Sequence, residues 1–338
     1  MYIMFKTLQI SWVEIEECIY FCYKISNAQG RSEECIYFCY KVSNKMYGLR
    51  SNTDAQSNAE LVKKINNLND STSYFNIKDI FALRLDYNDV NDIKEFTAKI
   101  TQGRRVNEEK FTVEGTSALY IGNREYHTFS GCSTINYESI SSLSDDEKQF
   151  ATLLDQVVLN EEVVRGTNES KTDTFIDYIL REVGLGKYPL AIRLKPVYVF
   201  KVRHKTISSE YDFSVEKKGK LLMVEEDKHI KNTGPGSAWG EYQLAGEMIA
   251  GAFENYRKFA TSSEIFSVRA IGPRFTFYHV IIPTTYLASL DKGLPEETIT
   301  ISRYPPQNHI PPGLDYKKLS DREVIIDLLM KIKQTMIS

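Results

Sequence analysis

The chain has 338 residues, 42% of them hydrophobic, and its 42 basic and 45 acidic residues leave a formal net charge of -3. This composition predicts a globular chain with one large or two modest domains, and it excludes a wholly disordered chain. It also excludes nucleic-acid binding through overall charge, so such binding would need a local basic surface. No stretch reaches the roughly 18 to 20 apolar residues of a membrane span, and Lys6 and Gln9 interrupt the first apolar stretch. We therefore expect an intracellular protein, in the nucleus or cytoplasm, with no membrane partner.

The first part of the chain carries a duplication that includes four of the five cysteines. Residues 16–27 (EECIYFCYKISN) recur as residues 33–44 (EECIYFCYKVSN), with Val42 in place of Ile25. The two C-x3-C pairs resemble the spacing of a zinc site. A single copying event would produce the same spacing, however, and the Tyr, Ile and Phe content favours a copied β-strand. The odd number of cysteines fits a reducing compartment better than a disulfide scaffold.

Helical and strand-like patterns alternate along the rest of the chain, while residues 77–100 are compatible with both. We expect a mobile connector over residues 46–70 with a short helix around 60–68, short strands over 111–134, a helix after Ser144 and a helix over 172–183. The apolar period then changes, and it predicts strands over 197–202, 211–215 and 221–226, a helix after Trp239, and strands over 265–271, 275–283 and 298–302. A capping box, Ser320-x-x-Glu323, predicts the start of the last helix.

This order of elements predicts three regions. Residues 1–110 hold the duplicated segment and the connector, and residues 111–167 hold lead-in strands and a helix. Residues 168–338 form an α/β domain in which helices flank a mixed sheet. Gly246, Ala250 and Gly251 would let the helix after Trp239 approach that sheet closely.

A charge cluster stands at the end of one strand that looks buried. The apolar run LLMV (residues 221–224) continues directly into EEDK (residues 225–228). Charges at the end of a buried strand are costly unless protein, metal or substrate pairs with them. The sequence therefore raises the question of what pairs with these charges.

The preceding strand offers a partner for the cluster. If the hairpin turn centres on Lys218, Asp212 lies opposite Val224 and diagonal to Glu226. Because alternate residues share a face, Asp212, Glu226 and Lys228 would converge on one side of the sheet. Glu225 and Asp227 would then point to the other side, at its rim.

Two carboxylates and an amine in one place suit metal-dependent hydrolysis of a phosphodiester. Asp212 and Glu226 would hold Mg²⁺ (or Mn²⁺), which polarises the phosphoryl oxygen and lowers the pKa of a bound water. Lys228 would position that water or stabilise developing charge. The alternative is a solvated strand end with ordinary surface ion pairs.

These residues resemble a known family. Asp212, a turn, and Glu226-Asp227-Lys228 at the end of an apolar strand resemble the PD-(D/E)XK nuclease superfamily, whose members share a helix, strand hairpin, helix core. The pattern NES…FIDYILRE…VEEDKHIKN…YQLAGEMIAGA, within about residues 168–255, is further similar to the nuclease-like carboxyl-terminal regions of Crinkler-type effectors. The family's Pro before the first acid is Tyr211 here. The resemblance implies a restriction-endonuclease-like fold and Mg²⁺-dependent hydrolysis of DNA.

The resemblance also implies two further site residues. Glu169, just ahead of the first core helix, would join Asp212 and Glu226 at the metal, and Gln243, on the helix after the motif, would belong to the catalytic site. On the residues alone, Glu169 could instead favour the helix start through the helix dipole, and Gln243 could be an ordinary polar helix residue. We expect the neighbouring acids Glu241 and Glu247 to lie in solvent.

Basic residues near the hairpin could track a phosphate backbone. The candidates for nucleic-acid contact are Lys201, Arg203, Lys205, His229 and Lys231. A solvated strand face is the alternative. The expected partner is DNA, with RNA left open because no residue resolves the sugar. The other functional alternative is a catalytically inactive nuclease-fold or effector protein that binds nucleic acid or protein, and the oligomeric state is not predicted.

Overall fold

The structure, a computed structural model, describes residues 57–102, 144–162, 169–228, 235–307 and 312–338, and the backbone of residues 8–15, 18–25 and 35–41. The chain divides into two compact units, Met1–Ser57 and Asn58–Ser338. In the first unit, the described strands form an antiparallel sheet of β1 (Leu8–Ile15), β2 (Cys18–Ile25) and β3 (Cys35–Lys41). The two copies of the duplicated segment are therefore paired strands, which confirms that part of the prediction.

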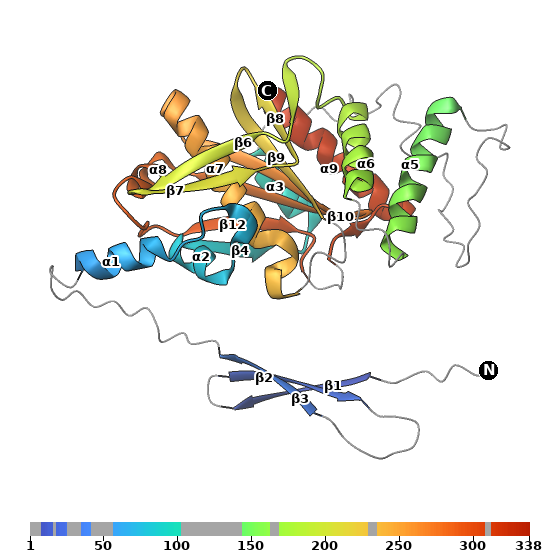
Figure 1. The fold of residues 1–338 in the computed structure, drawn as a ribbon. Helices are drawn as coiled ribbons and strands as arrows, with labels where there is room; N and C mark the ends of the chain where they lie inside the picture. Colours follow the sequence, from blue (N-terminus) through green and yellow to red (C-terminus); the bar gives the residue numbers. More distant parts are fainter. Residues whose placement is uncertain are drawn as a thin grey trace. The chain divides into compact units, whose positions relative to one another are not determined.

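The described strands of the second unit form one large mixed sheet and a separate hairpin (Figure 1). The sheet contains β4 (Leu85–Asp89), β5 (Leu190–Leu194), β8 (Phe213–Lys217), β9 (Lys220–Lys228), β10 (Ser263–Ile271), β11 (Arg274–Ile282), β12 (Ile299–Tyr304) and β13 (Leu314–Asp315). Their order is β4-β12-β11-β10-β9-β8-β5, with β13 paired to β11. The β9–β10 and β12–β4 pairs are parallel, and the others are antiparallel. The hairpin consists of β6 (Val197–Val202) and β7 (Lys205–Glu210).

Helices cover both faces of this sheet. On one face, α3 (Ile93–Thr101), α5 (Asp145–Glu162), α6 (Ser170–Glu182) and α9 (Leu319–Ile337) build the α6-side cluster, a buried apolar cluster that includes Phe175, Phe213, Met223 and Phe266. On the other face lie α1 (Ser57–Asn66), the 3-10 turn η1 (Thr72–Tyr74), α2 (Ile77–Ala82), α7 (Glu241–Phe259), α8 (Thr284–Leu290) and the β6–β7 hairpin. These elements build the α7-side cluster, which includes Leu221, Val224, Leu244 and Tyr278.

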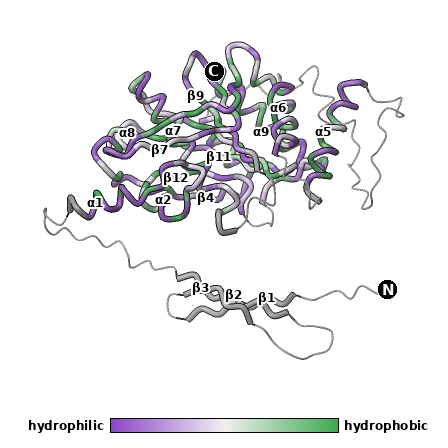
Figure 2. The backbone as a smooth tube through the Cα atoms, in the orientation of Figure 1, coloured by the Kyte–Doolittle hydropathy of each residue, from purple (hydrophilic) through white to green (hydrophobic). Residues whose placement is uncertain are grey.

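The helices carry the alternation of apolar and polar residues that such a layered packing requires. Figure 2 shows hydrophobic and hydrophilic segments alternating along α6, whose apolar residues enter the α6-side cluster. Within the described parts of the chain, no helix is both long and apolar enough to span a membrane. A mixed α/β fold with helices on both faces of a mixed sheet is therefore confirmed.

The large unit takes in more of the chain than the range 168–338 that the sequence predicts for the α/β domain. The ambiguous residues 77–100 form α2, β4 and most of α3. Because β4 pairs in parallel with β12, this early segment supplies an edge strand of the sheet. The strands expected over residues 111–134 lie outside the described residues.

Most of the expected elements from Ser144 onward are present. The expected strands near residues 197, 221, 265, 275 and 298 are β6, β9, β10, β11 and β12, while the strand expected from Tyr211 begins at Phe213 as β8. Ser144 caps α5 as expected, since its Oγ accepts from the Glu147 N–H at 3.3 Å and its own N–H donates to Glu147 Oε2 at 2.8 Å. The strands β5 and β7 are not predicted from the sequence.

The capping box expected at the start of α9 is wrong. The helix begins at Leu319 with Lys318 as its N-cap and without a side-chain cap hydrogen bond. The N–H of Arg322 already donates to the carbonyl of Lys318, at 2.9 Å, which leaves Ser320 inside the first turn. Ser320 Oγ instead lies 3.3 Å from Asp321 Oδ1.

Two glycines of α7 allow the close packing that the sequence predicts. A Cβ on Gly251 would lie 2.8 Å from Leu221 Cδ2 on β9. A Cβ on Gly246 would lie 2.6 Å from Thr72 Cγ2 and 2.8 Å from the ring of Phe75, beside η1. The first glycine thus fixes the distance between helix and sheet, and the second fixes the distance between helix and η1.

Gly246→Ala should destabilise the protein by about 1 to 3 kcal/mol, because overpacking outweighs the gain in helix propensity. The measurement is urea unfolding followed by circular dichroism. Gly186→Ala is the control, since its added Cβ would meet Ile192 Cδ1 at an ordinary 3.4 Å. A Gly246→Ala variant as stable as the wild type would contradict the close packing of α7 on η1.

Candidate functional site

The β8–β9 hairpin has a two-residue turn and a β-bulge. Lys218 and Gly219 have φ values of 52° and 78°, which suit a type I′ turn, and Lys217 pairs with Lys220 across it. The register shifts beyond Glu216, which pairs with Leu221, whereas Val215 pairs with Met223. Leu222 is therefore the extra residue of a bulge.

The bulge decides which acid faces Asp212. Beyond it Phe213 pairs with Glu225, so continuing the register by one residue places Asp212 directly opposite Glu226. The expected register, with the turn centred on Lys218 and Asp212 opposite Val224, is wrong, because Val224 pairs with Ser214. Without the bulge, the two-residue turn would place Asp212 opposite Glu225 and turn Glu226 to the other face.

Lys195, just after β5, joins Asp212 to an acid of α6. Its Nζ lies 3.0 Å from Asp212 Oδ1 and 3.4 Å from Asp173 Oδ2. Its backbone N–H also donates to the Asp212 carbonyl, at 3.0 Å. Partial burial alone would lower the pKa of the Lys195 amine, but the hydrogen bonds and charges of Asp212 and Asp173 raise it above its usual range. A protonated amine therefore lies between the two carboxylates.

Asp173 is the α6 acid in contact with this group, and sequence reasoning missed it. Glu169 is the half-buried N-cap of α6, without a side-chain cap hydrogen bond, and its carbonyl accepts from the Asp173 N–H at 3.0 Å. Asp173 lies four residues after Glu169 and therefore on the same helix face, and this spacing is the signal in the sequence that points to Asp173. Oδ1 of Asp173 is buried and has no hydrogen-bond partner among the described residues.

Glu226 is enclosed between β9 and α7. It is 1% exposed, and Gln243 Nε2 donates to its Oε1 at 2.5 Å. The same Gln243 nitrogen donates to Glu247 Oε1 at 2.9 Å. Glu247 is 0% exposed, so the expectation that it lies in solvent is wrong. The structure brings Gln243 to Glu226, and it adds a second buried carboxylate that the sequence did not predict.

A buried ionic network lies next to Glu226 on the same face. Arg269 of β10 is the register neighbour of Glu226. Its NH1 lies 3.4 Å from Glu241 Oε1, and Arg303 NH1 of β12 lies 2.6 Å from Glu241 Oε2. Tyr278 donates its hydroxyl to Glu241 Oε1 at 2.8 Å, and burial raises the pKa of Tyr278 well above its usual range, so this donor stays protonated.

Glu241 is therefore a structural acid and not the solvated residue that the sequence predicts. It is 1% exposed, because two arginines from strands remote in sequence and one tyrosine compensate its charge. Such compensation is what allows a carboxylate to be buried.

Arg269 also holds a strained turn ahead of α7. Ala238, Trp239 and Gly240 have consecutive positive φ values of 48°, 58° and 85°. Arg269 NH1 donates to the carbonyls of Ala238, at 3.3 Å, and Trp239, at 2.9 Å. Non-glycine residues in this region cost roughly 1 to 3 kcal/mol each, and they persist only when the surroundings enforce them. Arg269 thus fixes the start of the helix that carries Gln243.

The remaining residues of the motif are described only in part. Glu225 is 1% exposed on the α6 side, opposite Phe213, so its expected place at the rim is wrong. For Asp227 and Lys228, the last two residues of β9, only the backbone is described. His229 and Lys231 lie outside the described residues.

The other basic candidates lie at the far end of the β6–β7 hairpin. Lys201 and Arg203 are exposed, and Lys205 Nζ pairs with Asp70 Oδ1 at 2.8 Å. Lys195 lies just before β6, and Lys201, Arg203 and Lys205 lie at the other end of that strand. At about 3.3 Å per residue, β6 separates Lys195 from these three residues by roughly 20 Å. They do not converge on Asp212.

Comparisons with known proteins add no relationship. No family model and no curated protein matches the chain. Among the described residues, no three His, Cys, Asp or Glu side chains are grouped closely enough to hold a metal ion. Two pairs of carboxylates are instead joined by a side chain between them, Asp173 and Asp212 by the Lys195 amine and Glu226 and Glu247 by the Gln243 amide.

Arg269→Met should destabilise the protein by about 3 kcal/mol or more, because it removes one partner of a buried charge. In a double-mutant cycle with Glu241→Gln, the combined loss should fall short of the sum by about 1 to 3 kcal/mol. Chemical unfolding measures both values. Arg257→Met, which breaks an exposed pair with Glu254 on the same helix, should change stability by less than about 1 kcal/mol. Equal effects of Arg269→Met and Arg257→Met would contradict the network.

Proposed function

We propose that the chain is a Mg²⁺- or Mn²⁺-dependent nuclease that hydrolyses phosphodiester bonds of DNA beside Asp212 and Glu226. The observation that carries this proposal is the bulged register, in which Phe213 pairs with Glu225. The same register continued by one residue would set Asp212 opposite Glu226. The order α6, β8–β9 hairpin, α7 supports it further, because it agrees with the helix, hairpin, helix core of the superfamily that the sequence resembles.

The chemistry of the donor set fits a divalent cation. Carboxylate oxygens are the ligands that Mg²⁺ prefers. The ammonium of Lys195 already lies between Asp173 and Asp212, so these side chains accept a cation in the folded protein, and a buried oxygen of Asp173 still has acceptor capacity. Asp212 and Glu226 would hold the metal with Glu169, as the resemblance implies, and Asp173 is a further candidate. A bound metal supplies a Lewis acid and a more acidic water.

Side chains of the chain itself would position this chemistry. Gln243 fixes the orientation of the Glu226 carboxylate, and Arg269 fixes the start of the helix that carries Gln243. Lys195 holds the Asp212 carboxylate and keeps a positive charge beside it. Lys228, two residues beyond Glu226 on β9, would position water or stabilise the charge that develops on the phosphate.

In this proposal, the distance from Lys195 to the tip of the β6–β7 hairpin sets the length of DNA that the protein contacts. The separation of roughly 20 Å corresponds to about six base pairs at 3.4 Å each. Lys201 and Arg203 would therefore contact the backbone about half a helical turn from the cleaved bond. His229 and Lys231, which follow the motif directly, would contact phosphates beside it.

One observation favours the alternative function, a catalytically inactive protein that binds nucleic acid or another protein. Glu226 is 1% exposed and bound to Gln243, and the described residues form no three-ligand metal group. A binding protein would retain the buried polar contacts as structure and would need no metal.

Asp212→Asn, Glu226→Gln and Lys228→Met should each reduce Mg²⁺-dependent DNA cleavage by about 100-fold or more, because each removes a ligand or a charge that acts on the reacting phosphate. The assay follows cleavage of defined DNA and RNA substrates with and without EDTA. Mg²⁺ should also raise the melting temperature of the wild type, and not that of Asp212→Asn.

Glu210→Gln is the matched control, since it neutralises an exposed acid two residues before Asp212. It should leave both cleavage and the Mg²⁺ effect unchanged. A triple variant that cuts as well as the wild type would contradict the proposal. A wild type that binds DNA, does not cut it and does not respond to Mg²⁺ would support the inactive alternative.

A further inference from the structure

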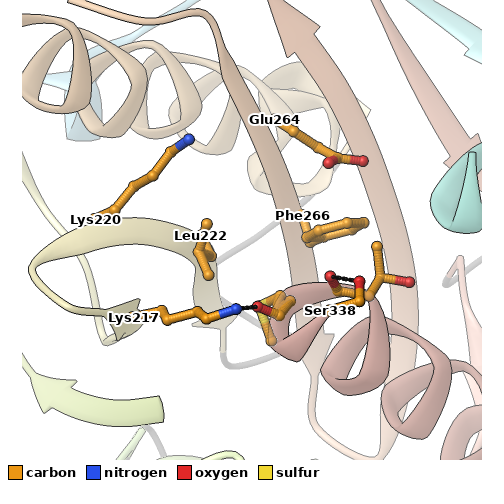
Figure 3. Close-up of a pocket in the computed structure, with 8 residues that line it drawn as sticks. Lys217, Lys220, Leu222, Glu264, Phe266 and Ser338 are labelled. Carbon is orange, nitrogen blue, oxygen red and sulfur yellow. Dashed lines mark hydrogen bonds between the residues drawn. The ribbon is translucent and has the colours of Figure 1, made fainter. Parts of the chain in front are cut away.

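A cavity of about 470 Å³ lies at the opposite end of β9 from Glu226. In Figure 3, Lys220 and Leu222 of β9 lie on one side of it, Glu264 and Phe266 of β10 lie on the other, and the end of α9 closes it from below. Lys220 and Glu226 are separated by roughly 20 Å along the strand at 3.3 Å per residue. The cavity is thus distinct from the candidate metal site.

Lys220 and Leu222 of β9 form one wall of this cavity. Leu221 packs in the α7-side cluster, whereas both Leu222 and Met223 pack on the α6 side. Between the turn and the bulge the side chains of β9 alternate regularly, so Lys220, next to Leu221, also faces the α6 side. Phe266 reaches the same side from β10. The wall therefore combines one amine with two apolar side chains.

Two of the charged side chains that line the cavity, Lys217 and Glu264, already have hydrogen-bond partners. Lys217 Nζ donates to the carbonyls of Met336, at 2.9 Å, and Ile337, at 2.5 Å, at the end of α9. Glu264 Oε1 accepts from Gln102 Nε2 at 2.7 Å and lies 3.0 Å from His279 Nε2.

Lys220 is the cation of the cavity that remains available to a ligand. The structure gives it no hydrogen bond or ion pair with any residue it describes, and the side chain is half-buried. A partly buried amine without a counter-charge binds an anion more strongly than a fully solvated amine does. Among the described side chains of the lining, Lys220 thus supplies the amine for a ligand, and Leu222 and Phe266 supply apolar surface.

We propose that this cavity binds a small amphipathic monocarboxylate. The carboxylate pairs with Lys220 Nζ, and a flat apolar body lies between Leu222 and Phe266. The volume falls within the range of about 300 to 1,000 Å³ that small-molecule sites occupy. A single available cation favours a monoanion over a phosphate dianion, and the apolar wall favours an aromatic body over a sugar.

The probe is 2-naphthoate, compared with its neutral counterpart 2-naphthamide by isothermal titration calorimetry on the full chain. The acid should bind at least about tenfold more tightly than the amide, because a charge-assisted hydrogen bond is lost with the amide. Lys220→Met should remove this difference, and Lys220→Glu should transfer the preference to 2-naphthylmethylamine.

Lys218→Met is the control, because it makes the same change of charge on the exposed turn next to the cavity. It should leave the affinity for 2-naphthoate unchanged. Leu222→Trp fills the cavity and should abolish binding of both naphthalene probes. The proposal is overturned if neither probe binds the wild type, if both bind equally, or if Lys220→Met and Lys218→Met have the same effect. Mg²⁺-dependent cleavage plays no part in this test, so its outcome is independent of the nuclease proposal.

Discussion

The bulge at Leu222 is the constraint on which the register of the acidic end of β9 depends. A two-residue turn alone would pair Asp212 with Glu225, since strands extend from such a turn in strict register. One extra residue in β9 pairs Phe213 with Glu225 instead, and the same register continued by one residue would set Asp212 opposite Glu226. The acid pair proposed for the site therefore rests on this single irregularity.

Burial of charge is the second constraint, and it explains how a buried strand can end in acids. Glu226 and Glu247 both accept from the amide of Gln243, and Glu241 contacts two arginines and a tyrosine. Each of these partners comes from α7 or from strands β10 to β12. Packing of α7 on the sheet therefore forms these polar contacts at the same time, which ties the candidate site to the stability of the core.

The sequence predicts the elements of this region better than their pairing. The apolar period identifies α6 and α7, because each buries one regular face, and a continuous apolar run identifies β9. It cannot reveal the bulge, since Leu221, Leu222, Met223 and Val224 are all apolar and carry no alternation.

The polar contacts of the site are equally hidden in the sequence. Burial of Glu241 depends on Arg269 and Arg303, which are remote in sequence and give no local signal. Asp173 is one helical turn from the predicted Glu169, but its contact with Lys195 requires the pairing of β5 with β8, and the sequence does not predict β5. Among the predicted site residues, the structure brings Gln243 to Glu226, on elements that the sequence does predict.

The most direct test of the register is a pair of cysteine variants under mild oxidation, with the linked peptides identified by mass spectrometry. Directly opposite residues of an antiparallel pair lie about 4.5 to 5.5 Å apart at Cα, within disulfide range, whereas residues on opposite faces do not form the bond readily. Asp212→Cys with Glu226→Cys should cross-link efficiently, and Asp212→Cys with Glu225→Cys should not. Preferential cross-linking of the second pair would contradict the bulged register, and with it the proposed acid pair.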